Sequence, residues 1–376
     1  MHLYLHIPFC HLACHYCDFH FSTNTQLKEN LIQSMLKELD LSKDYLSEKE
    51  LETVYFGGGT PSLLENKDFD LLFEKIHSHY SLKNNVEITI ESNPEDIQEE
   101  KLGFWKELGI NRLSLGIQSL EDSILKNLNR NHQAKDSFKA LDLCEKYGFN
   151  SLSADLMYGL PKQTPQSLIQ DIQSLSQRNI NHISAYNLTI EPNTVFGKWK
   201  KQGKLTDFEN HEHAQFMDIL YQELENQGFE NYEISNFARN KAYSKHNTSY
   251  WRNEEYLGIG PSAHSYNGSS RQWNIANNAK YNLFLKEEKA YFEKEILTES
   301  DKINEYILTN IRTKWGINLP KLKTDFIRLN KIFPDKYVEN LEKKGLARIE
   351  KEFLILNFEG KLIADEISLE LIMSEE

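Results

Sequence analysis

Three of the four cysteines, Cys10, Cys14 and Cys17, lie within eight residues of one another, while Cys144 stands alone on a predicted helix. A disulfide framework needs paired cysteines in an oxidising compartment, and three crowded thiols suit neither requirement. Metal binding is therefore the first chemistry to consider, and we interpret Cys144 as structural. A structural zinc site would need one histidine to complete a Cys3His set. Four histidines lie close enough in the sequence to supply it: His6, His11, His15 and His20.

An iron–sulfur cluster is the alternative that the cysteine spacing favours. The pattern C-x3-C-x2-C lacks the second pair of ligands that usual zinc ribbons and fingers carry. A [4Fe–4S] cube bound by three thiolates keeps one iron without a protein ligand, and that iron can bind a substrate or cofactor directly. The short spacings suit one loop that wraps around three corners of such a cube.

The segment from Tyr4 to Cys17, YLHIPFCHLACHYC, closely resembles the cluster loop of the radical S-adenosylmethionine superfamily. Within this superfamily it is similar to the branch that contains oxygen-independent coproporphyrinogen III oxidase and its haem-chaperone relatives. The resemblance implies a [4Fe–4S] cluster bound by the three cysteines, with S-adenosylmethionine at the open iron. It also implies a partial parallel (β/α)6 barrel.

A run of glycines, Gly57-Gly58-Gly59-Thr60-Pro61, follows the second predicted strand. It lacks the Gly-Lys-Ser/Thr end of a P-loop, and alone it would more often be a tight turn. Its place, one β-α unit after the cysteines, resembles the strip that binds the amino group of S-adenosylmethionine. In the resembled family Glu91 would contact the first such molecule, and Gln118, Arg130 and Asp155 would lie nearer a second one or the substrate. The full set of expected S-adenosylmethionine contacts is Tyr4, Tyr16, Gly58, Gly59, Thr60, Glu91, Gln118, Arg130 and Asp155.

A third motif, His246-Asn247-Thr248-Ser249-Tyr250-Trp251, carries a histidine and two large aromatic residues. From the residues alone it is most simply an aromatic loop that packs under the barrel, with an ordinary hydrogen-bonded histidine. The pattern H-N-x-x-Y-W, however, resembles the signature that separates haem chaperones from the oxidases. Imidazole is suited to haem iron and flat rings to the macrocycle. We therefore expect haem contacts at His246, Asn247, Tyr250 and Trp251, with His264 an equal candidate for the iron ligand on chemistry alone.

These residues must be positioned by an alternation of short apolar runs and amphipathic segments. Short buried runs bounded by turn residues are typical of parallel strands, and six β-α units predict an α/β sheet curled toward a TIM-like barrel. Strands are predicted at 3–7, 53–56, 87–90, 112–116, 151–157 and 182–187. Helices are predicted at 25–41, 65–79, 96–108, 121–147 (as two helices) and 165–178.

We divide the chain into a radical S-adenosylmethionine barrel at 1–207, an extension that completes its core at 208–297 and a C-terminal domain at 298–376. The extension is predicted to contain a helix at 208–227, a strand near 232–234 and loops between 236 and 278. In the C-terminal domain, helices at 300–314, 319–331 and 334–343 precede strands at 346–349 and 353–356 and a helix at 361–373. This order resembles a winged helix, an α+β fold that often binds DNA.

Charge argues against nucleic acid as a partner. The whole chain carries a net charge of −13, and residues 298–376 hold 13 Lys and Arg against 15 Asp and Glu. Such surfaces repel a phosphate backbone. The N-terminus lacks the basic and apolar regions of a signal peptide, and no apolar run is long enough to cross a membrane. We therefore expect a cytoplasmic protein that is not a transmembrane protein.

The residue at position 19 separates the two functions in the resembled branch. The oxidase pattern has a fourth cysteine two residues after the third, and this chain has Phe19 there. The chain also lacks the long segment that precedes the cluster loop of the oxidase. Both departures favour a haem chaperone without oxidase activity, which would deliver haem to acceptor proteins, respiratory ones among them, and could form a homodimer. The open alternatives are a radical oxidative decarboxylase of coproporphyrinogen III and a radical methyltransferase-like relative.

Overall fold

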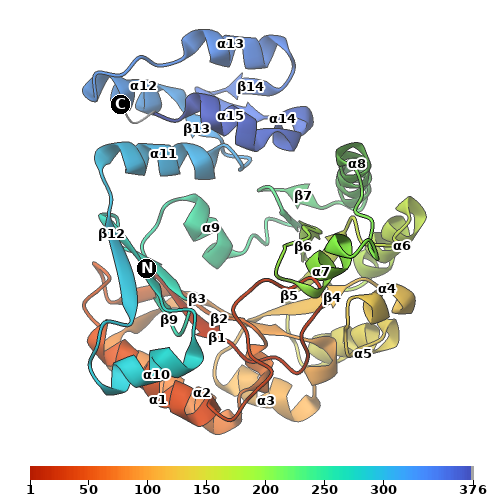
Figure 1. Ribbon diagram of the computed structural model, residues 1–376, viewed down its shortest axis with the longest axis vertical. Helices are drawn as coiled ribbons and strands as arrows, with labels where there is room; N and C mark the ends of the chain where they lie inside the picture. The colour runs from red at the N-terminus through yellow and green to blue at the C-terminus, as the bar shows by residue number, and fades with distance from the viewer. Residues whose placement is uncertain (374–376) are drawn as a thin grey trace.

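The computed structural model describes residues 1–373, in which one twelve-stranded sheet curves into a partial barrel (Figure 1). Its central strands are parallel, and they run in the order β9-β1-β2-β3-β4-β5-β6. This arrangement confirms the predicted α/β fold with a parallel TIM-like sheet. The bounds of these strands are β1 His2–Ile7, β2 Glu50–Gly58, β3 Ser81–Ser92, β4 Arg112–Gln118, β5 Ser151–Tyr158, β6 His182–Asn187 and β9 Tyr256–Ile259.

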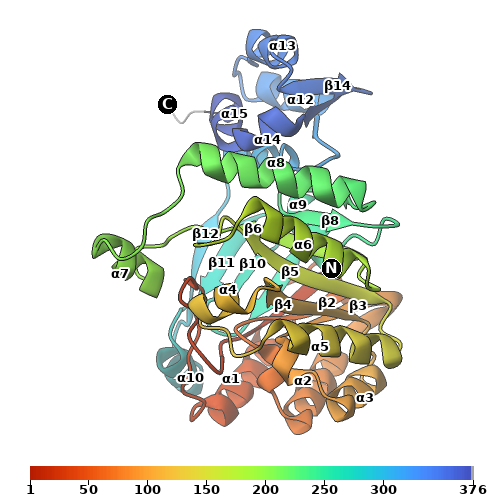
Figure 2. The same ribbon diagram turned by 90° about the vertical axis from the view of Figure 1, so that its right-hand side faces the viewer.

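Helices form an arc around the outside of the curved sheet (Figures 1 and 2). Their apolar faces pack on buried strand residues such as Leu3, Leu5, Val54 and Phe56, which are fully shielded from solvent. The predicted strands and helices are confirmed in order, including two helices at 121–147. These helices are α1 Lys28–Leu41, α2 Asn66–His79, α3 Glu99–Glu107, α4 Asp122–Asn127, α5 Ala134–Lys146 and α6 Pro165–Ser176, with short 3-10 turns at Pro61–Leu63 and Pro94–Asp96.

Antiparallel strands extend the sheet at both edges, and here two sequence predictions were wrong. The residues 232–234 do not form a strand but the turn between β7 and β8, which pair beside β6. The region 236–278 was predicted as loops, but it contains the helix α9 and the four strands β8 to β11. Two of these strands, β10 and β11, form the antiparallel edge beside β9 together with β12. The elements are α7 Val195–Lys201, α8 Asn210–Asn226, β7 Glu230–Asn231, β8 Asn236–Ala238, α9 Lys245–Trp251, β10 His264–Tyr266, β11 Ser270–Asn274, α10 Asn278–Lys286 and β12 Phe292–Ile296.

The C-terminal residues from α11 onward build a separate apolar cluster around Ile307, Leu322, Leu341, Leu354 and Ile367. Three helices and a small antiparallel sheet are present as predicted, although the expected last helix is broken in two at position 363. Within residues 1–373 no helix is long and apolar enough to cross a membrane. The elements are α11 Glu299–Asn310, β13 Ile317–Asn318, α12 Leu319–Arg328, α13 Asp335–Lys343, β14 Ala347–Glu350, β15 Phe353–Leu356, α14 Phe358–Leu362 and α15 Ala364–Leu371.

A buried carboxyl group joins α1 to the extension of the sheet. Glu38 has no exposed surface, and it accepts hydrogen bonds from the backbone N–H of Gly260 at 2.8 Å and from Asn274 Nδ2 at 2.6 Å. The hydroxyl of Tyr281 donates a further hydrogen bond to it. Burial raises the pKa of Glu38 to about 7 despite these three donors. The carboxyl therefore holds its proton more tightly in the folded chain than in the unfolded chain.

This pKa predicts how the stability of a Glu38→Gln variant depends on pH. Because the folded pKa lies above the ordinary value, ionising Glu38 favours the unfolded chain, and its contribution to stability falls as pH rises from about 4.5 to about 7. The neutral amide removes this loss. The variant should therefore gain about 3 kcal/mol in unfolding free energy relative to the native chain between pH 5 and pH 8, as measured by urea titration.

The matched control is Glu29→Gln, on the same helix but exposed. The unfolding free energy of this variant should differ from that of the native chain by the same amount at pH 5 and at pH 8. An equal difference for Glu38→Gln at pH 5 and pH 8 would show that this carboxyl ionises freely in the folded protein.

Candidate functional site

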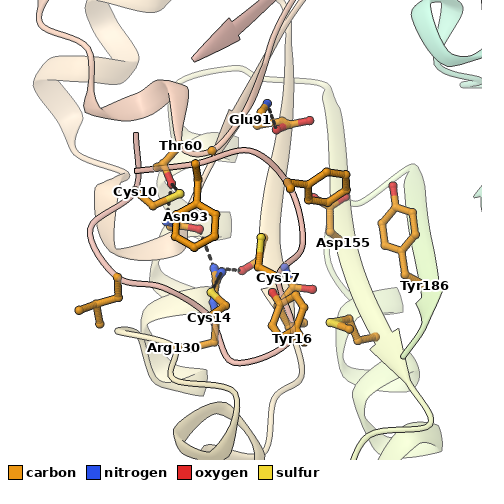
Figure 3. Close-up of a pocket in the computed structure, with 18 of the residues that line it drawn as sticks. Cys10, Cys14, Tyr16, Cys17, Thr60, Glu91, Asn93, Arg130, Asp155 and Tyr186 are labelled. Atoms are coloured by element: carbon orange, nitrogen blue, oxygen red, sulfur yellow. Dashed lines mark hydrogen bonds between the residues drawn. The ribbon is translucent and has the colours of Figure 1, made fainter. Parts of the chain in front are cut away.

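The three clustered cysteines lie on the loop that follows β1, at the carboxyl ends of the parallel strands (Figure 3). Cys10, Cys14 and Cys17 are free thiols, partly exposed, and all three line one cavity of about 610 Å³. Burial raises the pKa of the Cys17 thiol to about 11 and raises that of Cys10 as well. Cys144 lies apart from them, buried in α5.

Backbone hydrogen bonds join the two ends of this loop to each other and hold its middle on the segment after α4. Near its start, Ser22 N–H donates to the carbonyl of Pro8 at 2.6 Å, and Cys10 N–H donates to the carbonyl of Ser22 at 3.1 Å. Near the middle, His15 N–H donates to the carbonyl of Leu128 at 3.1 Å. The loop is therefore fixed to the mouth of the barrel by backbone contacts.

The glycine run at the end of β2 packs directly against the cysteine loop. A Cβ atom on Gly59 would lie 2.9 Å from Cys10 Sγ and 2.7 Å from the carbonyl oxygen of Phe9. Gly58 has a φ of 109°, a conformation that favours glycine, and a Cβ there would lie 2.8 Å from the ring of His6. Glycine is therefore required at both positions for the backbone of β2 to approach the thiols this closely.

Two carboxyl groups lie inside the mouth of the barrel. Glu91, at the end of β3, accepts hydrogen bonds from Tyr55 Oη at 2.8 Å and from the N–H of Gly58 at 3.1 Å. Asp155, in β5, accepts one from Ser114 Oγ at 3.0 Å. Burial, and then the charge of Asp155, raise the pKa of Glu91 to about 7; burial raises that of Asp155 to about 6. Within residues 1–373 neither group has a cationic partner at hydrogen-bonding distance, so a cationic ligand would be stabilised between them.

Arg130 connects the cysteine loop to the opposite strands. Its Nη1 donates to Cys14 Sγ at 3.5 Å, and its Nη2 donates to Asn93 Oδ1 at 2.6 Å and to the carbonyl of Gly116 at 2.8 Å. Gln118 ends β4 at a register shift and has a φ of 66°, which turns its side chain toward the cavity. Strained backbone of this kind is frequent at binding sites.

The structure brings together all the residues predicted to contact S-adenosylmethionine. They line the same cavity as the thiols: Tyr4, Tyr16, Gly58, Gly59, Thr60, Glu91, Gln118, Arg130 and Asp155. Other residues that line this cavity were not predicted from the sequence, among them Asn93 and Tyr186. These two lie at or just beyond the end of a parallel strand, so a search for polar residues at all six strand ends would have found them.

The histidines considered for a Cys3His zinc site have other partners. His6 bonds the carbonyl of His20, His11 bonds Asp96 Oδ1, and His15 bonds the carbonyl of Asn127. His20 bonds the side chain of Asn278 at 2.7 Å. Within residues 1–373, no three His, Cys, Asp or Glu side chains are grouped so as to hold a single metal ion.

A second cavity, of about 740 Å³, adjoins the first and shares four lining residues with it: Tyr4, His6, Phe19 and Tyr186. Three of the four residues expected to contact haem line this second cavity, namely Asn247, Tyr250 and Trp251 of α9. His246 does not line it. His246 is 1% exposed, and its ring points from α9 toward β2, where it contacts Thr53 on one side and Tyr250 of its own helix on the other.

Comparison with known proteins agrees with this architecture. The family model "Radical SAM superfamily" matches residues 4–175. The solved structure of coproporphyrinogen III oxidase (HemN) from Escherichia coli, described as a radical SAM enzyme, superposes with a TM-score of 0.82. The superposition covers 98% of this chain and 88% of the oxidase. Because the two sequences are only 22% identical, this likeness shows the fold alone.

Curated relatives match along nearly the whole chain. The protein named "Heme chaperone HemW" from Bacillus subtilis (strain 168) is 34% identical over 369 residues, which is 97% of each chain. Its namesake from Lactococcus lactis is 32% identical and covers 91% of this chain and 90% of the relative. The protein of the same name from Haemophilus influenzae is 31% identical, and the match covers 100% of this chain and 98% of the relative.

The parallel barrel with three thiols from one loop over its mouth agrees with the match of residues 4–175 to the radical SAM superfamily. Within the superfamily, the similarity over the full length places the chain in the family of the proteins named heme chaperone HemW.

The contact between Gly59 and the cysteine loop yields a prediction about packing. A Gly59→Ala variant must push the loop away from β2, which should lower the unfolding free energy by about 2 kcal/mol and speed alkylation of Cys10 by iodoacetamide. The control is Gly103→Ala in α3, where a Cβ meets only the ring of Tyr147 at 3.9 Å. That variant should be unchanged or slightly more stable, because alanine favours helix. Equal stabilities and equal alkylation rates for the two variants would refute the proposed close contact.

Proposed function

We propose that this protein is a haem chaperone, which binds haem, a [4Fe–4S] cluster and S-adenosylmethionine and delivers the haem to acceptor proteins. The observation that carries the proposal is the pair of adjoining cavities. One cavity gathers three free thiols, and the other gathers aromatic and histidine side chains, with Phe19 and Tyr186 in both walls. The names of the full-length relatives support the same function.

The donor set at the mouth of the barrel fits a [4Fe–4S] cluster. Cys10, Cys14 and Cys17 come from one loop, carry no disulfide and line one cavity, as three corners of a cube require. The guanidinium of Arg130 donates a hydrogen bond to Cys14 Sγ at 3.5 Å and so helps to hold this side chain at the cavity. We assign the cluster to these three cysteines, with one iron open to S-adenosylmethionine.

The remaining residues of the thiol-lined cavity would bind and orient S-adenosylmethionine. Glu91, held by Tyr55 and Gly58, offers a carboxylate to the amino group, and the glycine run lets the ligand approach the backbone. Asp155 and Arg130 line the same cavity, where they would contact a second molecule or other ligand groups. When bound, the cluster and S-adenosylmethionine supply one-electron cleavage of a carbon–sulfur bond.

The second cavity would hold the haem. Tyr250 and Trp251 present aromatic surface from α9, and Tyr256 and Tyr266 present it from the facing strands. Flat aromatic rings pack well on a flat macrocycle, and pockets of 300–1,000 Å³ are the usual size for bound cofactors. The shared wall would place the haem beside S-adenosylmethionine and the cluster.

Partners and assembly are a further part of the proposal. Phe19 is 75% exposed and Leu12 43% exposed, and both stand at the mouth of the thiol-lined cavity. Such an apolar rim suits contact with another protein, either a haem acceptor of the respiratory kind or a second copy of this chain in a homodimer. A cytoplasmic location is consistent with free thiols.

Haem binding and oxidase activity can be separated in one anaerobic experiment. The native chain, reconstituted with iron and sulfide, should bind added haem and develop a Soret band. It should form no decarboxylated product from coproporphyrinogen III when dithionite and S-adenosylmethionine are present, because Phe19 stands where the oxidase pattern has a fourth cysteine. Absorption spectra and chromatography of the porphyrins measure the two outcomes.

The E. coli oxidase, run in parallel, is the positive control for product formation. Product from this chain at a comparable rate would overturn the chaperone proposal in favour of the oxidase. Absence of both a Soret band and product would leave neither function standing.

A further inference from the structure

The second cavity contains a histidine that is better placed for haem iron than the one in the H-N-x-x-Y-W motif. We propose that His264, at the start of β10, is the side chain that ligates haem iron, and that His246 has a positioning role. The inference rests on the proposed function, because it names the iron ligand within the cavity assigned to haem.

His246 has no ring nitrogen left for iron. One nitrogen, Nδ1, lies 2.6 Å from Thr53 Oγ1, and the other, Nε2, lies 2.8 Å from Tyr250 Oη. Its ring stacks on Tyr55 with the centroids 4.8 Å apart. Burial also lowers the pKa of His246 well below its ordinary value, so the ring stays neutral. The histidine therefore ties α9 to β2 and holds Tyr250 at the cavity wall.

His264 is free for a ligand where His246 is not. Its side chain is exposed and lines the second cavity, and within residues 1–373 it forms no hydrogen bond. Its ring stacks on Trp273, its cross-strand neighbour in β11, with the centroids 6.3 Å apart. One face of the imidazole is thus supported while its nitrogens remain open to the cavity.

The backbone of β10 fixes the direction of this side chain. Ser265 is buried and its hydroxyl accepts a hydrogen bond from the N–H of Gly258 at 2.9 Å. Because side chains alternate along a strand, His264 and Tyr266 both face the other way, and both line the cavity. Gly258 is required beside them, since a Cβ there would lie 2.1 Å from the carbonyl oxygen of His264.

The other two histidines of the cavity are less suitable ligands. His6 uses Nδ1 with Tyr4 Oη at 3.0 Å and Nε2 with the carbonyl of His20 at 3.0 Å, and it is 5% exposed. His20 has its Nε2 engaged with Asn278 Oδ1 at 2.7 Å. Among the described histidines that line the cavity, His264 alone keeps both ring nitrogens free of hydrogen bonds.

The surrounding wall suits a flat ligand that carries carboxylates. Arg271 is the one lysine or arginine among the described residues that line the cavity. It pairs with Glu305 at 2.7 Å, and its Nε has no hydrogen-bond partner in the described part of the chain. A guanidinium is the usual partner of a carboxylate, and haem carries two propionates. The rings of Tyr256 and Tyr266 also line the cavity. The wall therefore offers aromatic surface for a flat macrocycle and a guanidinium for its carboxylates.

The test is a haem titration of the full-length chain and three variants, followed by absorption and electron paramagnetic resonance spectra. His264→Ala should weaken haem binding by about tenfold or more and change the axial-ligand signature. Added imidazole should restore that signature in His264→Ala by occupying the space of the lost ring. His246→Gln and His20→Ala should keep the native signature, although His246→Gln should melt at a lower temperature because α9 loses its tie to β2.

The outcomes distinguish this inference from the function on which it rests. If the native chain gives no Soret band, the haem-chaperone proposal fails. If the native chain binds haem and a folded His264→Ala variant keeps the native affinity and signature, His264 is not the ligand. Loss of the signature in His246→Gln or His20→Ala, with His264→Ala unaffected, would assign the ligand to that residue instead. Circular dichroism of each variant confirms that it is folded, and imidazole rescue tests the ligand even if His264→Ala is destabilised.

Discussion

The structure depends on the close approach of a glycine backbone to a loop of cysteines. Parallel pairing of β1 with β2 places Ile7 beside Gly58, so both strands end at the same edge and their following loops must share the space above it. With the Cβ of any other residue at position 59, Cys10 would have to move. This single contact sets the position of the first thiol, and the hydrogen bonds from Ser22 and His15 position the rest of the loop.

The same edge of the sheet carries two carboxyl groups whose ionisation is unfavourable in the folded chain. Glu91 and Asp155 are half-buried, and their raised pKa values show that the folded chain makes each carboxyl harder to ionise. A ligand with a positive charge would relieve that cost, which is why an otherwise unfavourable pair of carboxyls is consistent with a binding site. Phe19 and Tyr186 then separate this polar mouth from the aromatic cavity that we assign to haem. The two sites are therefore neighbours, and a ligand in one can contact the wall of the other.

The sequence alone was sufficient for the barrel and for the thiol-lined cavity, because both depend on local patterns. Short apolar runs predicted the six strands, and the cysteine spacing, the glycine run and polar residues at strand ends predicted part of the cavity lining. The extension was predicted poorly because its strands are two to five residues long, too short for a periodic pattern. In addition, β8 and β9 join the sheet by pairing with strands from elsewhere in the chain, β6 and β1. The role of His246 was equally hidden, since its partner Thr53 is 193 residues away in the chain. No local pattern distinguishes a histidine with two buried hydrogen bonds from one that faces a cavity.

The central claim is that haem and the cluster occupy adjoining cavities at the mouth of one barrel. The most direct measurement is a crystal structure of the anaerobically reconstituted protein with haem bound, with the iron atoms located by anomalous scattering. We predict a cluster of four irons beside Cys10, Cys14 and Cys17, with three of these irons bound by the thiolates, and a fifth iron in the cavity between α9 and β10, bounded by Tyr250 and Tyr266. A haem iron on the C-terminal helices, or on the outer surface of the barrel, would contradict the account.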